Sequence, residues 1–487
     1  MLGASIPLSF FSDLAFETSV VARSLADYLS GGALRLGVTG LSKAGKTVFI
    51  TALIDNLIAG ARLPVLRASA EGRIARAHLE PQPDDAVSRF AYEEHSAALR
   101  GPDRRWPQST RRISQLRLTI EFERPAGWGS RASELTLDIV DYPGEWLLDL
   151  LLLDKSYAQW SRETIEASEA KARAPLAAPW RAFLGGLDPL AKADEETARA
   201  AAELFTAYLR KARDDVYALS TLAPGRFLMP GDLEGSPALT FAPLPLNEDQ
   251  RIAPRSLAAM MERRYEAYKT HVARPFFRDH FARLDRQIVL VDALRALNSG
   301  PAALRDLENA LAEVMQAFRA GRASRLASIF RPHIDRVLFA APKADHLHHA
   351  SHDRLEAILR VLTAKAIARA ERVGAEIDVI ALSAVRATRE AEMRHAGETL
   401  EAIIGVPEAA ERIGGHVFDG VAEAAVFPGE LPEDPEAAFA GDSAALPEAD
   451  NDWRFVRFRP PVTAPGAPAP HIRLDRALQF LIGDKLA

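Results

Sequence analysis

The feature that most constrains this chain is the octapeptide GLSKAGKT at Gly40–Thr47. It follows an apolar run, Leu34–Thr39, and precedes a helical pattern, Val48–Leu57. A G-x-x-x-x-G-K-[ST] loop between a strand and a helix predicts a phosphate-binding loop. Its two glycines permit backbone conformations in which successive N–H groups turn inward around a phosphate. A plain glycine-rich turn is the alternative, and the flanking strand and helix argue against it.

The residue types within this loop predict separate roles. We expect Lys46 to reach the β- and γ-phosphates and the Thr47 hydroxyl to ligate Mg²⁺, while the helix N-terminus adds a partial positive charge. Lys43 either touches a phosphate or faces solvent. The residues expected to bind the nucleotide here are Gly40, Ser42, Lys43, Ala44, Gly45, Lys46 and Thr47. The loop alone does not determine which nucleotide binds, or whether it is cleaved.

The composition is that of an ordinary globular protein, and it excludes some functions. A chain of 487 residues has room for about three domains. Its 60 basic and 66 acidic residues give a net charge of −6, so no overall positive field recruits nucleic acid or anionic lipid. The absence of cysteine excludes disulfides, thiolate metal sites and thiol catalysis, and it fits a cytoplasmic location.

Residues 1–30 are predicted to form an N-terminal amphipathic helix. The stretch Ile6–Leu29 resembles a signal peptide at first, but four charged residues interrupt it and no basic leader precedes it. Packing on the body of the protein is the simplest role for this helix, and peripheral membrane contact is the alternative. Since no run of about 18 apolar residues occurs, we expect no membrane-spanning segment.

Strand and helix patterns alternate along much of the chain. The predicted strands are Leu34–Thr39, Leu116–Phe122, Leu135–Val140, Ile288–Val291, Val337–Ala341 and Ile377–Leu382. Helical patterns between and after them include Ala302–Phe318, Asp353–Arg372 and Thr388–Ile403. This alternation predicts an α/β fold with a doubly wound P-loop NTPase sheet. Leu116–Phe122 alternates more than the others, so we expect it at the edge of the sheet.

Long interruptions divide the predicted sheet. Residues 62–106 are too long for a simple connection, and 147–285 read as a helical insertion containing a Pro/Gly-rich stretch, Leu222–Leu246. We expect a G domain in two parts, 31–146 and 286–404. A C-terminal α+β module, 405–487, would follow, with a mobile acidic loop at 432–452, antiparallel strands around Trp453–Phe458 and a closing helix at Leu474–Leu486.

A second motif, DYPGE at Asp141–Glu145, directly follows the strand Leu135–Val140. An acid at this strand end can hold the Mg²⁺ shell, so Asp141 is a predicted metal ligand, and Gly144 can offer its N–H to a γ-phosphate. A strand-ending turn is the alternative. Glu145 occupies the position where small GTPases carry the glutamine that orients water. It is either catalytic or a switch residue of another kind, because a carboxylate also repels the phosphate.

Two further motifs follow later strands and predict guanine recognition. In PKAD at 342–345, Asp345 would accept hydrogen bonds from guanine N1 and N2, and the Lys343 stem would cover the base. Adenine presents the wrong donors to that acid, but an exposed turn is the alternative. Pro342 departs from the usual Asn or Thr and cannot brace the loop. Ser383 and Ala384 match the loop that backs the guanine, although a helix-capping serine would look the same.

A switch threonine should precede the second strand. Thr110 is our candidate for a metal-binding and catalytic role, with Ser109 as the alternative. Arginines flank it at 104, 105, 111 and 112. One of them is a candidate arginine finger, and a solvated basic loop is the simpler reading.

Together, the motifs GLSKAGKT, DYPGEW and APKADH resemble those of Ras-like GTPases, and more closely the YcjX-like family of bacterial stress-associated nucleoside-triphosphatases. The resemblance implies GTP binding, slow hydrolysis to GDP with Mg²⁺, and a cytoplasmic or membrane-peripheral protein. It would act as a switch on an unknown effector through the helical insertion or the C-terminal module, as a monomer or homodimer. The competing hypotheses are a nucleotide-stabilised scaffold without hydrolysis and an ATP-using enzyme.

A histidine-rich stretch after Asp345 was considered as a metal site and rejected. Its members are His346, His348, His349 and His352. No neighbouring carboxylate or thiolate has the spacing of a familiar site, and the stretch begins a predicted helix beside the base pocket. The helical insertion likewise contains no convincing pair of catalytic carboxylates.

Overall fold

The structure is a computed structural model. It describes residues 32–40, 43–82, 84–108, 112–124, 132–214, 217, 219, 223–246, 252–317, 334–372, 374–395, 398–413, 415–440, 455–464 and 466–487. The predicted N-terminal helix, Ser42 of the phosphate loop and the candidate switch residues Ser109 and Thr110 lie outside these ranges.

A mixed eight-stranded sheet forms the centre of the molecule, in the order β2-β4-β5-β1-β6-β7-β8, with β3 paired to β4. Its strands are β1 (Leu34–Gly40), β2 (Ile74–Glu80), β3 (Ser88–Arg89), β4 (Ser114–Glu123), β5 (Ala132–Asp141), β6 (Arg286–Leu290), β7 (Arg336–Ala341) and β8 (Glu376–Ala381). Strands β5, β1, β6, β7 and β8 run parallel to their neighbours in this series, whereas β2 and β4 are antiparallel. The predicted α/β class is confirmed.

The position predicted for Leu116–Phe122 is wrong. This segment lies within β4, which is hydrogen-bonded to β5 on one side and β2 on the other, so it is not an edge strand. Strand β2 is not among the predicted strands: its residues, IARAHLE, lie within the long connection at 62–106 and form no continuous apolar run. Only one of them, Ala77, is buried, as expected of a strand at the rim.

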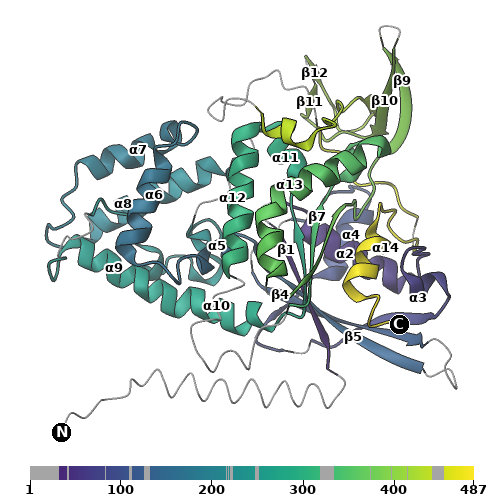
Figure 1. Ribbon diagram of the computed structural model, residues 1–487, viewed down its shortest axis with the longest axis horizontal. Helices are drawn as coiled ribbons and strands as arrows, with labels where there is room; N and C mark the ends of the chain where they lie inside the picture. Colours follow the sequence, from purple (N-terminus) through teal and green to yellow (C-terminus); the bar gives the residue numbers. More distant parts are fainter. Residues whose placement is uncertain are drawn as a thin grey trace.

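Helices cover both faces of the sheet, as a doubly wound fold requires (Figure 1). In β7, Val337 and Phe339 face one apolar core, while Leu338 and Ala340 face the other. The first core contains α5 (Trp146–Leu150), α10 (Arg274–Asp279), α11 (Ala293–Asn298), α12 (Pro301–Ala317) and α13 (His352–Glu371). The second contains α2 (Lys46–Ile58), α3 (Arg67–Ala70), α4 (Tyr92–Arg100) and α14 (Leu474–Ile482).

Between β5 and β6 in sequence, a group of helices forms a separate apolar core, seen on the left of Figure 1. Its helices are α6 (Tyr157–Ser168), α7 (Ala174–Gly185), α8 (Glu195–Ala212) and α9 (Leu257–Tyr268). The centre of this group is aromatic: the Trp160 and Tyr265 rings stack at 5.1 Å, and the Trp180 and Tyr208 rings stack at 5.6 Å. A buried ion pair between Arg173 and Asp306 joins the group to α12.

The helix predicted at Thr388–Ile403 is wrong. This stretch forms a hairpin of β9 (Arg389–His395) and β10 (Glu398–Gly405), and β10 also pairs with β13 (Ala424–Val426). Its Ala, Glu and Arg content favours a helix, but the strand pairing and the burial of Ala402 and Ile403 override that local propensity. A small ribbon of β11 (Arg412–Ile413) and β12 (His416–Val417) lies nearby.

The described part of the predicted acidic loop is packed, contrary to expectation. Pro435–Phe439 forms a 3₁₀ turn that contacts α12 and α13, and Ala438 and Phe439 are buried. Residues 441–452 lie outside the described ranges. Of the strand predicted around Phe458, the described part contributes one antiparallel bridge, between Pro407 and Phe458. The closing helix is present as α14.

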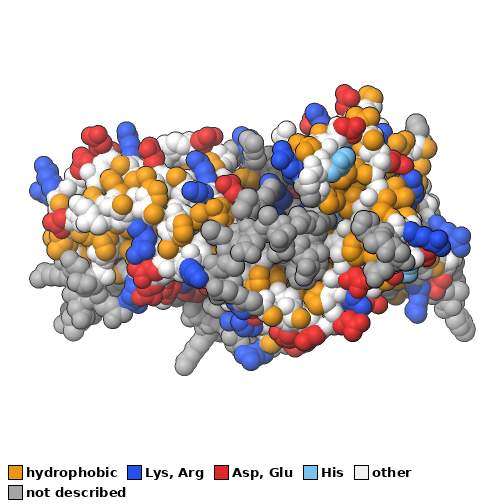
Figure 2. All heavy atoms as spheres, turned by 90° about the horizontal axis from the view of Figure 1, so that it is seen from above, with side chains coloured by type: hydrophobic (Ala, Val, Ile, Leu, Met, Phe, Trp, Pro, Cys, Tyr) orange, Lys and Arg blue, Asp and Glu red, His pale blue; other side chains and the backbone are white. Residues whose placement is uncertain are grey.

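Two surface properties bear on possible partners. No helix in the described ranges is long and apolar enough to cross a membrane. On the face shown in Figure 2, basic and acidic side chains are interspersed rather than gathered into one patch of either sign. That distribution agrees with the net charge of −6.

Candidate functional site

The phosphate loop begins where β1 ends, at Gly40. A Cβ atom on Gly40 would lie 2.6 Å from the Leu290 carbonyl oxygen, so only glycine fits this close approach. Gly45 has a φ of 81°, in the left-handed region that glycine adopts without strain. It precedes α2 without providing a side-chain cap, so the N–H groups of the first helical turn have no capping side chain there.

Lys46 and Thr47 lie at the start of α2 with little solvent exposure, 8% and 5%. The Lys46 ammonium donates a hydrogen bond to the Gly40 carbonyl at 2.8 Å, so its side chain folds back across the loop. Ala44 is also buried. The described loop residues therefore form a compact turn, and the Lys46 ammonium lies against it.

Asp141 ends β5, the strand next to β1. Because the two strands are parallel and Asp141 pairs with Val38, their carboxyl ends lie at the same edge of the sheet. Asp141 is 1% exposed. This register places a buried acid beside the strand that leads into the phosphate loop, as the sequence analysis expected.

Glu145 is buried and charged, with 2% of its surface exposed. Its carboxylate accepts a hydrogen bond of 2.9 Å from Arg213, which follows α8 in the helical group. Burial by itself raises the pKa of Glu145, but the positive charges of Arg213 and Lys46 outweigh it and hold that pKa below its usual range. Glu145 is therefore ionised at neutral pH and is a weak base.

Arg213 was missed by the sequence analysis. It is one arginine among many in a helical region, and no motif marks it. Its Nε and Nη2 atoms are buried without a hydrogen-bond partner among the described residues. These two N–H donors of Arg213, which lie near Glu145 and Lys46, can therefore donate to a bound anion.

The loop at Gly225–Met229, also within the helical insertion, contacts the backbone of the DYPGEW segment. A Cβ atom on Gly225 would lie 1.9 Å from the Glu145 carbonyl oxygen, so the two backbones touch. The Gly225 N–H donates to Asp149 at 2.7 Å, and the Trp146 indole donates to the Met229 carbonyl at 3.1 Å. Residues after Gly144 are thus held by a loop that precedes α9.

The loop after β7 carries the predicted base-recognition residues. Lys343 has a φ of 66°, and its ammonium pairs with Asp292 at 2.5 Å. Asp345 is 3% exposed, and its carboxylate accepts the Ala387 N–H at 2.8 Å. The Thr388 hydroxyl donates to the Asp345 carbonyl at 2.5 Å. Asp345 is therefore fixed from the segment that follows β8.

Other residues provide the brace that Pro342 cannot. The His352 ring hydrogen-bonds to the Ala344 carbonyl at 2.8 Å, and the Ala344 N–H donates to the Leu382 carbonyl at 3.0 Å. The sequence predicts neither contact, because the one motif that includes His352 is a histidine-rich stretch and Thr388 begins a predicted helix. Both residues instead hold the base-recognition loop.

Ser383 and Ala384 lie beside this loop and are buried. Ser383 exchanges backbone hydrogen bonds with Ile472, and its hydroxyl donates to the Val385 carbonyl at 3.0 Å. Since no described helix begins here, Ser383 is not the helix cap that was weighed as the alternative.

The described residues before the candidate switch threonine are anchored to the C-terminal segment. The Arg104 guanidinium donates to the Pro460 carbonyl at 3.0 Å, and the Trp106 indole donates to the Phe458 carbonyl at 2.6 Å. Arg104 is thereby engaged by backbone rather than directed at the phosphate loop. It is a weaker candidate for an arginine finger than Arg213.

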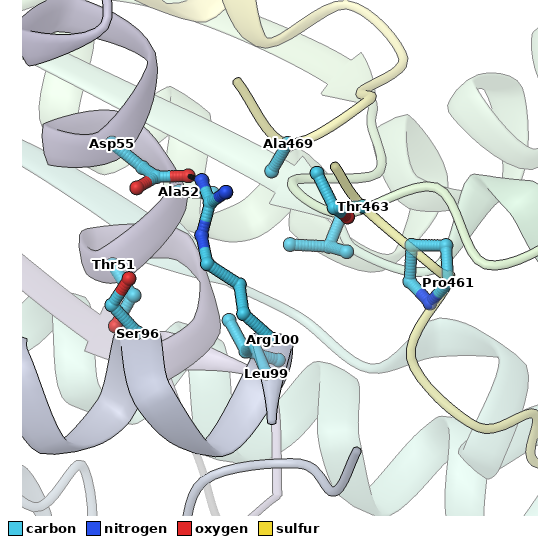
Figure 3. A pocket seen from close by; sticks show the side chains of 10 residues that line it. Thr51, Ala52, Asp55, Ser96, Leu99, Arg100, Pro461, Thr463 and Ala469 are labelled. Atoms are coloured by element: carbon cyan, nitrogen blue, oxygen red, sulfur yellow. Dashed lines mark hydrogen bonds and ion pairs between the residues drawn. The ribbon is translucent and has the colours of Figure 1, made fainter. Parts of the chain in front are cut away.

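A small pocket lies behind the phosphate loop, between α2, α4 and the C-terminal segment (Figure 3). The ion pair between Asp55 and Arg100 lies on one side of the pocket, and Pro461 and Thr463 lie on the other. None of the predicted nucleotide-binding residues lines it. The candidate site is therefore the edge of the sheet where Gly40, Asp141 and Asp345 lie, rather than this pocket.

Comparison with known proteins identifies the family. The model of the YcjX-like family, DUF463, matches residues 34–486. The chain belongs to the YcjX-like family. It is 40% identical over 466 residues to the Ras-like GTPase YcjX of Escherichia coli (strain K12), covering 93% of this chain and 96% of that protein. It is 35% identical over 482 residues to the Ras-like GTPase YcjX of Shewanella oneidensis, with 93% and 94% covered. The resemblance seen in the motifs is confirmed over nearly the whole chain.

Proposed function

We propose that this chain binds GTP with Mg²⁺, hydrolyses it slowly to GDP and phosphate, and acts as a stress-associated regulatory switch. One observation carries the proposal: parallel strands β5, β1, β7 and β8 bring Asp141, Gly40, Asp345 and Ser383 to one edge of a single sheet. Ligands of open α/β sheets bind at the carboxyl ends of the strands. The names of the two relatives support the same activity.

The phosphates would lie against the loop Gly40–Thr47 and the N-terminus of α2. Lys46 would exchange the Gly40 carbonyl for β- and γ-phosphate oxygens, which accept a charged donor more strongly. The oxygen donors of Thr47, Asp141 and Thr110 suit Mg²⁺, a hard cation that prefers such ligands. Mg²⁺ held there would neutralise charge on the phosphates.

Guanine would lie against the loop after β7. Asp345 already accepts the Ala387 N–H at one oxygen, and its remaining acceptor capacity would serve guanine N1 and N2. Lys343 would cover the base with its stem while Asp292 holds its ammonium, and Ser383 and Ala384 would back the ring. The neighbouring backbone contacts support a rigid pocket.

Hydrolysis would depend on Arg213 and on Gly144. A γ-phosphate competes with Glu145 for the Arg213 guanidinium, and the Gly144 N–H would detect the same phosphate. The lowered pKa argues against Glu145 as a general base, so we propose that it positions Arg213. Release of phosphate would restore the ion pair and move the helical group, which we treat as an insertion at 147–285 that contacts an effector protein.

The decisive experiment is a phosphate-release assay on the full chain with GTP or ATP, in the presence and absence of Mg²⁺. We expect slow turnover of GTP alone, dependence on Mg²⁺, and no turnover by Lys46→Ala. Absence of release by the wild type, with GTP still bound, would favour the scaffold. Equal use of ATP, unaffected by Asp345→Asn, would favour the ATP-using enzyme.

A further inference from the structure

The histidine-rich stretch rejected from sequence gains a carboxylate in the folded chain. Strand β9 places Glu390 beside His348 and His349, which lie at the 3₁₀ turn before α13. The Glu390 Oε2 atom is 2.9 Å from His349 Nδ1 and 3.9 Å from His348 Nε2. One ligand atom from each of the three residues lies within 4.8 Å of the others. The sequence analysis missed Glu390 because it predicted a helix there.

A fourth residue, Glu401 on β10, lies beside the other nitrogen of His348. Its Oε2 is 3.3 Å from His348 Nδ1, and the same Nδ1 accepts the Ala350 N–H at 3.5 Å. If Nε2 binds a metal, Nδ1 carries the proton instead, and the Glu401 carboxylate is near enough to accept it. Nε2 then presents a lone pair toward the Glu390 carboxylate, which is also an acceptor. A metal ion between these two acceptors would satisfy both of them.

The ligand set selects the class of cation. Two imidazoles and one carboxylate suit Zn²⁺ and related transition metals, whereas Mg²⁺ and Ca²⁺ prefer oxygen ligands alone. Bonds of about 2.0–2.2 Å in a tetrahedral site separate neighbouring ligand atoms by about 3.3–3.6 Å. The two contacts to Glu390, at 2.9 and 3.9 Å, bracket that spacing. A carboxylate on the other nitrogen of a ligating histidine is the usual outer partner of such sites.

We propose that His348, His349 and Glu390 bind a transition-metal ion of the Zn²⁺ class, with Glu401 orienting His348 and water completing the shell. The metal joins the turn that follows Asp345 to the β9–β10 hairpin. Ala387 and Thr388, just before that hairpin, hold Asp345. A bound metal therefore fixes both sides of the base-recognition loop. Metal binding requires no nucleotide. It can therefore be tested independently of the proposed GTPase function.

The test is titration of the chelator-treated full chain with Co²⁺, followed by its visible absorption, and with Zn²⁺ by calorimetry. We expect one equivalent to bind the wild type. His349→Ala and Glu390→Gln should abolish binding, and Glu401→Gln should weaken it about 10–100-fold. His349 has a 67% exposed side chain, so its replacement should not unfold the protein, which thermal melting without metal would verify.

His78→Ala is the matched control. His78 also has two carboxylates nearby, Glu80 at 2.9 Å and Glu121 at 3.8 Å, but no second imidazole. Its loss should leave metal binding unchanged. The proposal is overturned if the wild type binds neither metal, or if a folded His349→Ala/Glu390→Gln double variant binds with wild-type affinity. Equal weakening by His78→Ala would also overturn it, since it would indicate scattered surface binding.

Discussion

The two acids of the candidate site are held by different kinds of partner. Glu145, after β5, is held by a buried charge, Arg213, which comes from the helical group. Asp345, after β7, is held by the neutral Ala387 N–H and the Thr388 hydroxyl. A phosphate competes more strongly for a charged guanidinium than for a neutral backbone N–H or hydroxyl. Under the proposed function, Glu145 and Arg213 would respond to a phosphate, whereas Asp345 would stay in place.

The partners of the two loops also come from different parts of the chain. The helical group contributes Arg213 and the loop at Gly225, whereas the segment after β8 contributes Ala387 and Thr388. Under the proposed function, nucleotide hydrolysis would change the contacts of the helical group, whereas the segment after β8 would determine which nucleotide binds. Four substitutions test this division.

Arg213→Ala should have the largest effect. It should slow GTP hydrolysis about 10²–10³-fold, the usual loss when one charge-stabilising donor is removed. It should also cost about 3–5 kcal/mol of unfolding free energy, because Glu145 remains buried without its partner. Single-turnover phosphate release and denaturant unfolding would measure the two effects.

Arg210→Ala, on the exposed side of α8, is the control and should change neither quantity. An Arg213→Met/Glu145→Gln double variant removes both charges and should recover most of the stability without the activity. If Arg213→Ala hydrolyses GTP at the wild-type rate, the charge-held loop has no part in the reaction.

Asp345→Asn should weaken GTP binding about 10–100-fold while leaving turnover of bound GTP unchanged. An amide in place of the carboxylate keeps one acceptor but meets a guanine donor with an N–H group, losing a hydrogen bond to a charged acceptor worth about 1.5–3 kcal/mol. Affinity for a fluorescent GDP analogue and single-turnover rates would separate binding from chemistry. A loss in turnover without a loss in affinity would contradict the proposal that the Asp345 loop affects binding alone.

Gly225→Ala should disrupt the close backbone contact between residue 225 and Glu145 and so lower the stability of the protein. Its Cβ would need to displace the Glu145 carbonyl, 1.9 Å away, at a cost of about 1–3 kcal/mol. Gly185→Ala is the control, since a Cβ there meets no atom within 4 Å. Thermal melting should show a loss for the first variant alone, and hydrolysis should fall while GDP affinity stays constant.

Thr388→Val should have the smallest effect. It preserves shape but removes the hydroxyl that donates to the Asp345 carbonyl, costing about 1 kcal/mol. We expect GDP affinity to fall by up to about tenfold, with hydrolysis of bound GTP unaltered. An affinity within error of the wild type would mean that the Ala387 N–H suffices to hold Asp345.

Local sequence predicted the parallel part of the sheet well because strands such as Ile288–Val291 and Val337–Ala341 are continuous apolar runs buried on both faces. The phosphate loop was equally clear, since its glycines serve a local backbone geometry. The β9–β10 hairpin was missed because Ala, Glu and Arg favour helices wherever strand pairing does not override them.

Long-range partners could not be read from the sequence at all. Arg213 and Glu145 are separated by 68 residues, and Thr388 and Asp345 by 43. Nothing in the neighbourhood of either residue indicates its partner, because the contact depends on how whole elements pack. The predicted role of Thr110 stays a prediction, as it lies outside the described residues.

Arg286 at the start of β6 is 1% exposed and donates to the Leu481 carbonyl and to Asp484 beyond α14. Before those residues exist, a growing chain would have Asp335 as a partner for this arginine but would lack Asp484 and the Leu481 carbonyl, which makes its burial less favourable. We therefore expect the central sheet to reach its full stability only after residues 474–484 have left the ribosome. A chain that ends before residue 474 would be less stable than the full chain, even though it contains every nucleotide-binding motif.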